Sequence, residues 1–237
     1  MNDDEFIGIN DELNEETLKK YEELAERDDK DSNDTNNNKE ITSSGCPLIP
    51  RVVNIVACVE YGVPFDLNKI ATHLRNAEFN PKRFPAATIR IQEPKATALA
   101  FKNGKVNIVG CTTEDDAYLS ARKFGRIFKN LGFNVQMKSF NIANIVATMN
   151  CQFPIHLESL ASSKHKLFCT YNPEVFSGLI YRVNQRPKCT FLVFVSGKII
   201  VTGAKKIEHI HSAINYLYPI LQQYARNFQG KDDDDDQ

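Results

Sequence analysis

Two neighbouring apolar runs, CTFLVFV and KIIVTGA, fill residues 189–204 and are joined by a Ser-Gly pair. Successive side chains of a β-strand point to opposite faces, so Phe191 lies on one face of the first run and Leu192 and Phe194 lie on the other. Both faces are therefore apolar, and a strand of this kind is normally covered on both sides. The pattern predicts a β-hairpin with protein against one face and a ligand against the other.

The chain from residue 50 onward is an internal duplication. Matching motifs begin at Asn54 and Asn144, at Pro64 and Pro154, at Asn80 and Asn172, and at Phe101 and Phe194, with offsets of 90, 90, 92 and 93 residues. Offsets that rise in order indicate two copies of one fold with two small insertions. We place the copies at residues 47–136 and 137–227.

Each copy has the same order of elements. The first copy predicts strands at 52–60, 86–92, 96–102 and 105–111, a short helix at 67–75, and a long helix with the apolar stripe Tyr118, Ala121, Gly125, Phe128 and Leu131. The second predicts strands at 140–151, 179–183, 189–195 and 198–204, a short helix at 155–161, and a long helix with the stripe Ile207, Ile210, Ile214, Leu217, Leu221 and Tyr224. We expect an α+β domain with pseudo-twofold symmetry, in which a curved antiparallel sheet is covered by helices on one face and open on the other.

The net charge of −1 conceals a strong partition. Residues 1–46 carry 15 acidic and 5 basic side chains, a net charge of −10, and the tail at 228–237 contains five consecutive Asp. Residues 47–231 carry 10 acidic and 24 basic side chains, a net charge of +14. A strongly basic body indicates a polyanionic partner.

The acidic arm, residues 1–46, has the composition of a largely disordered segment. Within it Leu18, Tyr21, Leu24 and Ala25 recur at helical spacing after Asn14, a residue that favours the start of a helix, so we predict one short helix at 15–26. The arm has two interpretations: it aids solubility, or it competes with the polyanionic partner for the basic body.

Catalytic, metal and membrane signals are missing from the sequence. No P-loop and no clustered catalytic carboxylates appear, so we predict that the protein is not an enzyme and has no cofactor. The six cysteines lack C-x-x-C spacing, and with no visible secretory signal they indicate reduced thiols inside the cell rather than a metal site. The longest apolar runs, of about five residues, are too short to span a bilayer.

The open face of the predicted sheet should be an apolar floor with a few short polar side chains. From the first copy it takes Asn54, Val56, Leu99, Phe101, Asn107 and Val109, and from the second Asn144, Val146, Leu192, Phe194, Ile200 and Thr202. Basic residues lie at the rim, among them Arg83, Arg90, Lys105, Arg182, Lys198 and Lys205. A floor and rim of this kind fit the minor groove of DNA, where phosphates meet the rim and base edges meet the floor.

The sequence resembles the TATA-box-binding protein family. The resemblance covers about residues 47–227 and is carried by LRNAEFNPKRFPA (74–86), TALAF (97–101), PEVFSGLIYR (173–182) and FVSGKIIVTGAK (194–205). It implies a saddle-shaped domain with two long helices on the convex face. It also implies that Phe84 with Phe101, and Phe176 with Phe194, enter and unstack base steps, which is the bending mechanism known for this family.

The same resemblance implies the remaining roles. Asn54 and Asn144 would read A·T pairs at the pseudo-dyad, and the six rim residues named above would hold phosphates. Tyr171, Pro173 and Glu174 would contact the general factor known as transcription factor two-B. The implied partners are A/T-rich promoter DNA, general transcription factors, TBP-associated factors and the RNA polymerase machinery in the nucleus, and the resemblance leaves a homodimer in the absence of DNA open.

The chain departs from the family pattern in its first copy. Val109 stands where a Thr would donate a hydrogen bond, and Asn107 stands where an aliphatic residue is usual. We therefore expect an asymmetric or relaxed preference compared with a strict TATA consensus. The leading hypothesis is a general initiation factor that binds and kinks promoter DNA and nucleates the preinitiation complex. The alternative is a TATA-box-binding-protein-like scaffold or paralogue with weak or altered DNA specificity.

Overall fold

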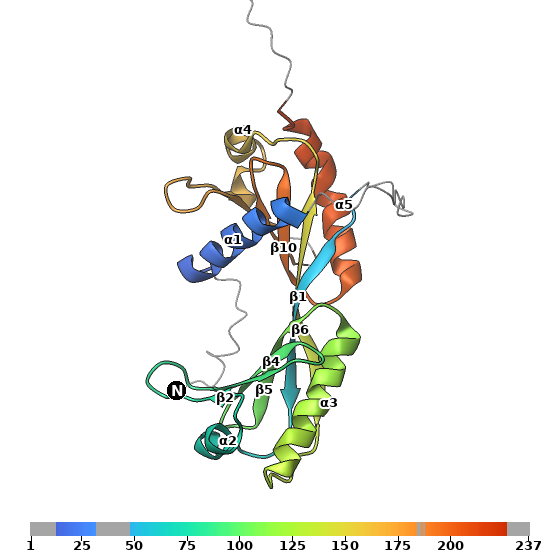
Figure 1. The fold of residues 1–237 in the computed structure, drawn as a ribbon. Coiled ribbons are helices and arrows are strands. Elements are labelled where there is room, and N and C mark those ends of the chain that lie inside the picture. Colours follow the sequence, from blue (N-terminus) through green and yellow to red (C-terminus); the bar gives the residue numbers. More distant parts are fainter. Residues whose placement is uncertain (1–12, 32–47, 184–185, 187, 227–237) are drawn as a thin grey trace, which may run out of the picture. The chain divides into compact units, whose positions relative to one another are not determined.

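The computed structural model describes residues 13–31, 48–183, 186 and 188–226. Ten strands form one antiparallel sheet in the order β2-β3-β4-β5-β1-β6-β10-β9-β8-β7, with helices packed on it (Figure 1). The strand order is itself duplicated, because β2-β3-β4-β5-β1 repeats as β7-β8-β9-β10-β6 when read from the opposite edge. The fold is therefore the predicted α+β arrangement with two repeats.

The chain divides into two compact units. One unit holds Pro50–Thr148 and Val201–Ile210. Its elements are β1 (Arg51–Glu60), α2 (Leu67–His73), β2 (Ala77–Glu78), β3 (Ala87–Ile91), β4 (Ala96–Ala100), β5 (Lys105–Cys111), α3 (Glu114–Asn130) and most of β6 (Ser139–Asn150). The division cuts through β6 because that strand pairs along the length of β1.

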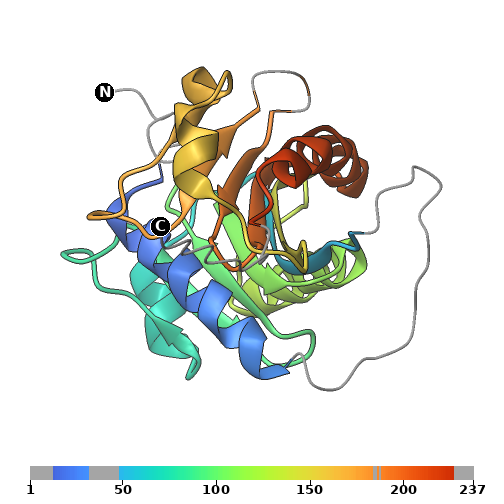
Figure 2. The ribbon, with the colours of Figure 1, turned by 90° about the horizontal axis from the view of Figure 1, so that it is seen from above.

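The other unit holds Met149–Ile200 together with helix α1 and most of helix α5. Its elements are α1 (Glu15–Asp31), α4 (Leu157–Ser162), the 3-10 helix η2 (Lys166–Phe168), β7 (Cys169–Thr170), β8 (Leu179–Arg182), β9 (Thr190–Val193), the start of β10 (Lys198–Ala204) and α5 (Ile207–Gln223). In Figures 1 and 2 helices α1 and α5 lie on opposite sides of β10.

Alternating side chains separate the core from the second face of the sheet. On β4 the three alanines are buried, while Thr97 and Leu99 between them are partly exposed. On β5 Val106 and Ile108 are fully buried, while Asn107 and Val109 are partly exposed. The buried side of these strands packs against α3, whose residues Ala117, Ser120, Ala121, Phe124 and Phe128 are buried. The hydrophobic core of the first repeat therefore lies on one side of the sheet only.

The two hairpin turns are built alike. Gly104 and Gly197 both have φ of 88°, a conformation that L side chains rarely adopt. A Cβ built on either glycine would lie 2.2 Å from a carbonyl oxygen, that of Val63 in one repeat and of Phe153 in the other. The predicted Ser-Gly turn and the equivalent Asn-Gly turn of the first repeat are thus both present, and both require glycine.

The register of β1 and β6 reveals a local twofold axis. Ile55 pairs with Ile145, and on either side Asn54 pairs with Val146 and Val56 pairs with Asn144. Because Ile55 and Ile145 are equivalent residues of the duplication, a residue and its own copy face each other at this point. The axis therefore passes between them.

Most predicted elements are present with bounds within a few residues. The strand predictions at 105–111 and 198–204 match β5 and β10 residue for residue. The short strands β2 and β7 were not predicted, because two residues carry no detectable alternation. Helix α1 runs to Asp31, five residues beyond its predicted end, and the rest of the acidic arm and tail lies outside the described residues.

The predicted stripe of helix α3 was partly wrong. Tyr118 is 43% exposed and Leu131 follows the helix as its C-cap, whereas Ala117 and Phe124 are fully buried. The ring of Tyr118 instead lies edge-on to Phe140, with centroids 5.4 Å apart. The stripe of α5 holds at Ile210, Ile214, Leu217 and Leu221, which are buried, but Ile207 is 38% exposed. The predicted apolar face of α3 and its observed buried face differ by one residue, which is about 100° of rotation around the helix.

Candidate nucleic-acid interface

Two equivalent asparagines hold their side chains in the same way. The backbone N–H of Gly110 donates to Oδ1 of Asn54 at 2.9 Å, and the N–H of Gly203 donates to Oδ1 of Asn144 at 2.8 Å. Since a backbone N–H needs an acceptor, each amide oxygen is fixed against the sheet and each Nδ2 group is the remaining donor. Nδ2 of Asn144 donates to Oγ1 of Thr202 at 3.0 Å. Val109, the counterpart of Thr202, offers no hydroxyl to Asn54.

The four candidate wedge residues form two aromatic pairs. The rings of Phe84 and Phe101 lie 6.3 Å apart at an interplanar angle of 61°, and those of Phe176 and Phe194 lie 5.7 Å apart at 68°. Each pair joins a loop residue to the residue that follows β4 or β9. Edge-to-face packing of this kind holds each ring at a fixed angle. The structure thus brings together, within each repeat, the two residues that the family resemblance pairs.

The remaining floor residues follow the strand alternation, but their exposure differs between repeats. In the first repeat Val56 is buried and Leu99, Asn107 and Val109 are partly exposed. In the second repeat Val146, Leu192, Ile200 and Thr202 are all buried. The first-repeat half of the floor is therefore the more accessible one in this structure.

Asn107 is held by a residue outside the predicted floor, Cys58. Sγ of Cys58 donates to Oδ1 of Asn107 at 3.2 Å, and the two residues are direct cross-strand neighbours on β1 and β5. Burial raises the pKa of the Cys58 thiol above its ordinary value while Lys105 lowers it, and the net shift is upward, so the thiol stays protonated and can donate. Alternation alone places Cys58 in the every-second-residue series of Asn54 and Val56, whereas its pairing with Asn107 depends on the register of β1 against β5.

The candidate phosphate-binding residues fall into two groups. Arg83, Arg90, Lys105, Arg182 and Lys205 are exposed. Arg90 pairs with Glu78 at 2.8 Å, and Arg182 donates to Oγ1 of Thr170 at 3.4 Å. Lys198 differs from this group because it is only 7% exposed and its Nζ donates to the backbone carbonyl of Ala25 on α1.

The candidate partner-binding loop lies just before β8. Tyr171 is partly exposed, and Pro173 and Glu174 are exposed. The side chain of Asn172 accepts a hydrogen bond from the backbone N–H of Glu174 at 3.2 Å, which orders the turn. The three predicted contact residues therefore lie together on one ordered and accessible loop.

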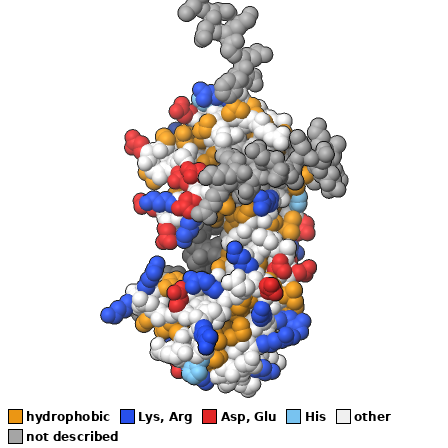
Figure 3. Space-filling view, in the orientation of Figure 1, with side chains coloured by type: hydrophobic (Ala, Val, Ile, Leu, Met, Phe, Trp, Pro, Cys, Tyr) orange, Lys and Arg blue, Asp and Glu red, His pale blue; other side chains and the backbone are white. Residues whose placement is uncertain are grey.

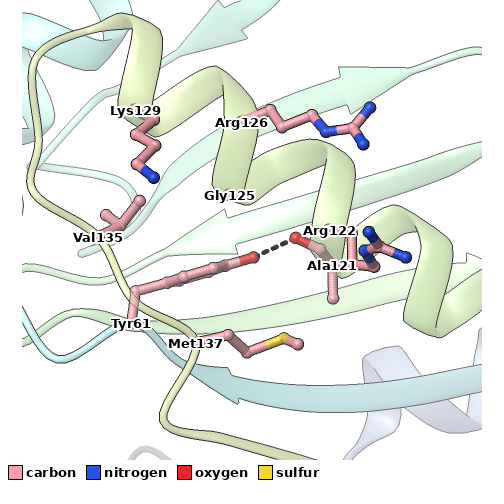
Figure 4. A pocket seen from close by; sticks show the side chains of 8 residues that line it. All are labelled: Tyr61, Ala121, Arg122, Gly125, Arg126, Lys129, Val135 and Met137. Carbon is pink, nitrogen blue, oxygen red and sulfur yellow. Dashed lines mark hydrogen bonds between the residues drawn. The ribbon is translucent and has the colours of Figure 1, made fainter.

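A separate basic surface lies on helix α3. Arg122, Arg126 and Lys129 surround a small pocket next to Tyr61, whose hydroxyl donates to the carbonyl of Ala121 (Figure 4). Burial raises the pKa of that hydroxyl. Lys and Arg side chains also gather over α3 at the lower right of Figure 3. This surface is distinct from the floor because α3 packs on the other side of the strands.

Membrane-spanning and metal-binding features are both missing from the described part of the chain. Its helices include none that is long and apolar enough to cross a membrane. Its His, Cys, Asp and Glu residues form no cluster of three with the geometry of a metal site.

Comparison with known proteins identifies the family. The family model described as transcription factor TFIID, or TATA-binding protein, matches residues 49–131 and again residues 139–224. The TATA-box-binding protein of Saccharomyces cerevisiae is 48% identical over 185 residues, covering 78% of this chain and 76% of that protein. The protein of the same name from Candida albicans is 45% identical over 208 residues, covering 88% of this chain and 84% of that protein.

A solved structure agrees with these sequence matches. The structure titled Methanococcus jannaschii TBP superposes with a TM-score of 0.65 at 32% identity, covering 73% of this chain and 98% of that one. The double family match, the sequence identities and the shared fold all point the same way. The chain belongs to the TATA-box-binding protein family, a family of transcription factors and not of enzymes.

Proposed function

We propose that this protein is a general transcription initiation factor that binds the minor groove of A/T-rich promoter DNA, kinks it, and nucleates the preinitiation complex in the nucleus. Family membership supports the coarse role, since its relatives carry the name TATA-box-binding protein. The finer mechanism is supported by the residues that line the open face of the sheet.

The observation that carries the proposal is the duplicated pair of phenylalanines. Two rings in edge-to-face contact occur at equivalent places in both repeats. Such a pair is an apolar wedge that can enter a base step. Unstacking costs a few kcal/mol per step and is offset by the extra protein surface that the bent duplex contacts. Flexible pyrimidine–purine steps lower that cost, so the proposal includes sequence preference through deformability.

Asn54 and Asn144 supply a second source of DNA sequence preference, for A·T over G·C pairs. Their Nδ2 groups are donors, and A·T pairs present only acceptors in the minor groove. A G·C pair places an amino group there, which would face another donor. The exposed Arg90, Lys105 and Arg182 would then hold phosphates beside the floor. Binding therefore combines a base-reading centre with a charged rim.

The same arrangement supports a role in assembling the preinitiation complex. With DNA on the floor, the loop of Tyr171, Pro173 and Glu174 remains accessible for a general transcription factor. The basic surface of α3 remains accessible as well, because α3 lies on the other side of the strands. No bond is made or broken in this function, so the protein acts by shaping DNA and holding partners.

The experiment measures bending and affinity with the full chain. A duplex of about 20 base pairs with an A/T-rich centre carries donor and acceptor dyes at its ends, and energy transfer reports the bend. The Phe84→Ala/Phe101→Ala double variant should reduce the bend and weaken binding at least about tenfold, because buried aromatic anchors carry much of an interface's energy. The matched control is Tyr118→Ala, which removes another exposed aromatic ring, from α3, and should change neither quantity.

A straight duplex in the presence of bound protein would contradict kinking. Unchanged affinity in the double variant, with binding still intact, would place DNA elsewhere on the molecule. Absence of any binding to an A/T-rich duplex would favour the scaffold hypothesis.

A further inference from the structure

Equivalent residues of the two repeats differ systematically in exposure. Phe84 is 36% exposed, but its counterpart Phe176 is 4% exposed. Lys105 is exposed, but its counterpart Lys198 is 7% exposed. The same contrast separates partly exposed Leu99 from fully buried Leu192. Because the repeats share one fold, something besides the sheet covers the second wedge site, Phe176 and Phe194 with the floor beside them.

Helix α1 lies against this second wedge site. Oε1 of Glu22 accepts two hydrogen bonds from Ser177, one from its backbone N–H at 2.9 Å and one from its hydroxyl at 2.8 Å. The carbonyl of Ala25 accepts a hydrogen bond from Nζ of Lys198. Ser177 adjoins Phe176 in the chain, and Lys198 is a candidate phosphate-binding residue. One polar contact of α1 thus lies next to Phe176, and the other is made by Lys198, whose backbone carbonyl accepts a hydrogen bond from the N–H of Phe194 at 2.9 Å.

The apolar side of α1 completes the contact. Leu18 is 7% exposed and Ala25 is 9% exposed, and Tyr21 and Leu24 are partly buried. These four residues form the apolar stripe predicted for the arm. Helix α1 lies on the side of β10 opposite to α5 (Figures 1 and 2). Asn14 caps the helix, since its Oδ1 accepts a hydrogen bond from the N–H of Thr17 at 2.8 Å. The apolar stripe of α1 is therefore packed against the protein rather than exposed to solvent.

We propose that α1 is an intramolecular occupant of the second wedge site and competes with DNA for it; this inference rests on the proposed function. The chemistry of the helix substitutes for that of the duplex. The Ala25 carbonyl takes the Lys198 donor that a phosphate oxygen would take, and the Glu22 carboxylate holds Ser177 next to Phe176. The apolar stripe covers the rings that base steps would cover. DNA can reach Phe176, Phe194 and Lys198 only after α1 leaves.

Competition of this kind has a calculable effect. When the binding-competent state is only a fraction of the molecules, apparent affinity falls by that fraction. If α1 is docked in about nine molecules of ten, the full chain binds about tenfold more weakly than a chain whose α1 cannot dock. The first wedge site stays accessible throughout, so an initial contact through Phe84 and Phe101 can precede displacement of the helix.

Three single substitutions in the full chain test this. Leu18→Asp places a charge on the buried side of α1 and should tighten binding to the A/T-rich duplex about tenfold. Simple repulsion by the acidic arm predicts the opposite sign, because this variant gains a negative charge. Glu22→Gln should tighten binding about threefold, since an amide oxygen is a weaker acceptor than a carboxylate. Glu26→Gln, the control, removes the same charge from an exposed position and should leave affinity nearly unchanged.

A fluorescent probe reads docking independently of affinity. The chain contains no Trp, so Tyr21→Trp introduces a single indole on the partly buried side of α1. Its emission should lie to the blue in the free protein and shift to the red on addition of the duplex. The shift should already be present without DNA when Leu18→Asp is combined with Tyr21→Trp.

The outcomes separate the two proposals. Equal affinity for the unmodified chain and Leu18→Asp, or an indole emission that neither DNA nor Leu18→Asp changes, would overturn competition while leaving DNA binding intact. Failure of every variant to bind the duplex would overturn the proposed function. The proposed competition would then be wrong as well, because there would be no DNA to compete with. This would hold even if the emission of the Tyr21→Trp variant showed that α1 docks.

Discussion

At the scale of single residues, Asn107 is the clearest departure of the floor from the family pattern, in which an aliphatic residue is usual at this position. Its oxygen accepts a hydrogen bond from the Cys58 thiol, so its Nδ2 group is a donor on the floor in addition to that of Asn54. Asn107→Val restores an aliphatic floor at this position. We expect this substitution to change the relative affinity for different base pairs at the positions bound by the first repeat. The change should be about 1 kcal/mol, or about fivefold, which is the typical contribution of one hydrogen bond.

In vitro site selection with the full chain and with Asn107→Val checks this expectation. Asn68→Val makes the same chemical change at an exposed position of α2 and should return the parental site. An identical narrow TATA optimum from parent and Asn107→Val would contradict a role for Asn107 in specificity.

How far single residues could be predicted depends on whether their role is local. The floor positions of Asn54, Asn107 and Asn144 follow from alternation and duplication alone. The contact between Cys58 and Asn107 does not, because it depends on the register of β1 against β5, which contains a shift between Ile55 and Ala57. Likewise Lys198 has the sequence position of a phosphate ligand, while its pairing with Ala25 joins residues 173 positions apart.

Buried thiols predict how stability depends on pH. Burial raises the pKa of Cys169 and of Cys189 from an ordinary value of 9.0 to about 11. Between these values the unfolded chain has lost thiol protons that the folded chain keeps, so the free energy of unfolding falls as pH rises above about 9. Urea unfolding at pH 8 and pH 10 should show this decline, and Cys189→Ala should make it shallower. A free energy of unfolding that rises over this interval would contradict the assignment.

At the scale of elements, the hairpin turns are the most constrained feature. Gly104→Ala forces a side chain into a left-handed backbone and to within 2.2 Å of the Val63 carbonyl oxygen. Gly110 also has a positive φ, 95°, but its nearest neighbours are 4.0 Å away. We expect Gly104→Ala to lower the free energy of unfolding by at least about 3 kcal/mol, and Gly110→Ala by about 1 kcal/mol.

Urea unfolding of both variants measures the difference between them. Equal losses would mean that the backbone angle alone sets the cost and that the loop around Val63 moves away from the new side chain.

Elements were predictable where one periodicity dominated. β5 and β10 have their predicted bounds because alternation and a turn define both ends. The stripe of α3 was misjudged by one residue because two phases fit its sequence, and only packing against β1, β4 and β5 buries Phe124 rather than Tyr118. Helix α1 was predicted from its stripe, but its contacts with Ser177 and Lys198 could not be predicted, because they join residues 155 and 173 positions apart.

At the scale of the whole molecule, charge is divided between an acidic arm and a basic body. The body carries a net charge of +14, yet its basic groups occupy both the rim of the floor and helix α3. Net charge alone therefore indicates a polyanion without indicating which surface binds it. The duplicated wedge pairs assign DNA to the floor in our proposal, and the occupied state of Lys198 makes the arm a competitor there.

Salt dependence tests that assignment. If the six candidate rim residues each displace one counterion, the logarithm of affinity should fall with a slope of about −5 against the logarithm of salt concentration, which is about a thousandfold between 50 and 200 mM. Lys105→Ala should reduce the slope by about 1, because it removes one phosphate contact. Lys129→Ala removes the same charge from the exposed rim of the α3 pocket and should leave the slope unchanged. A slope that responds to Lys129 and not to Lys105 would move the DNA from the floor to α3, and the wedge pairs would then have no part in binding.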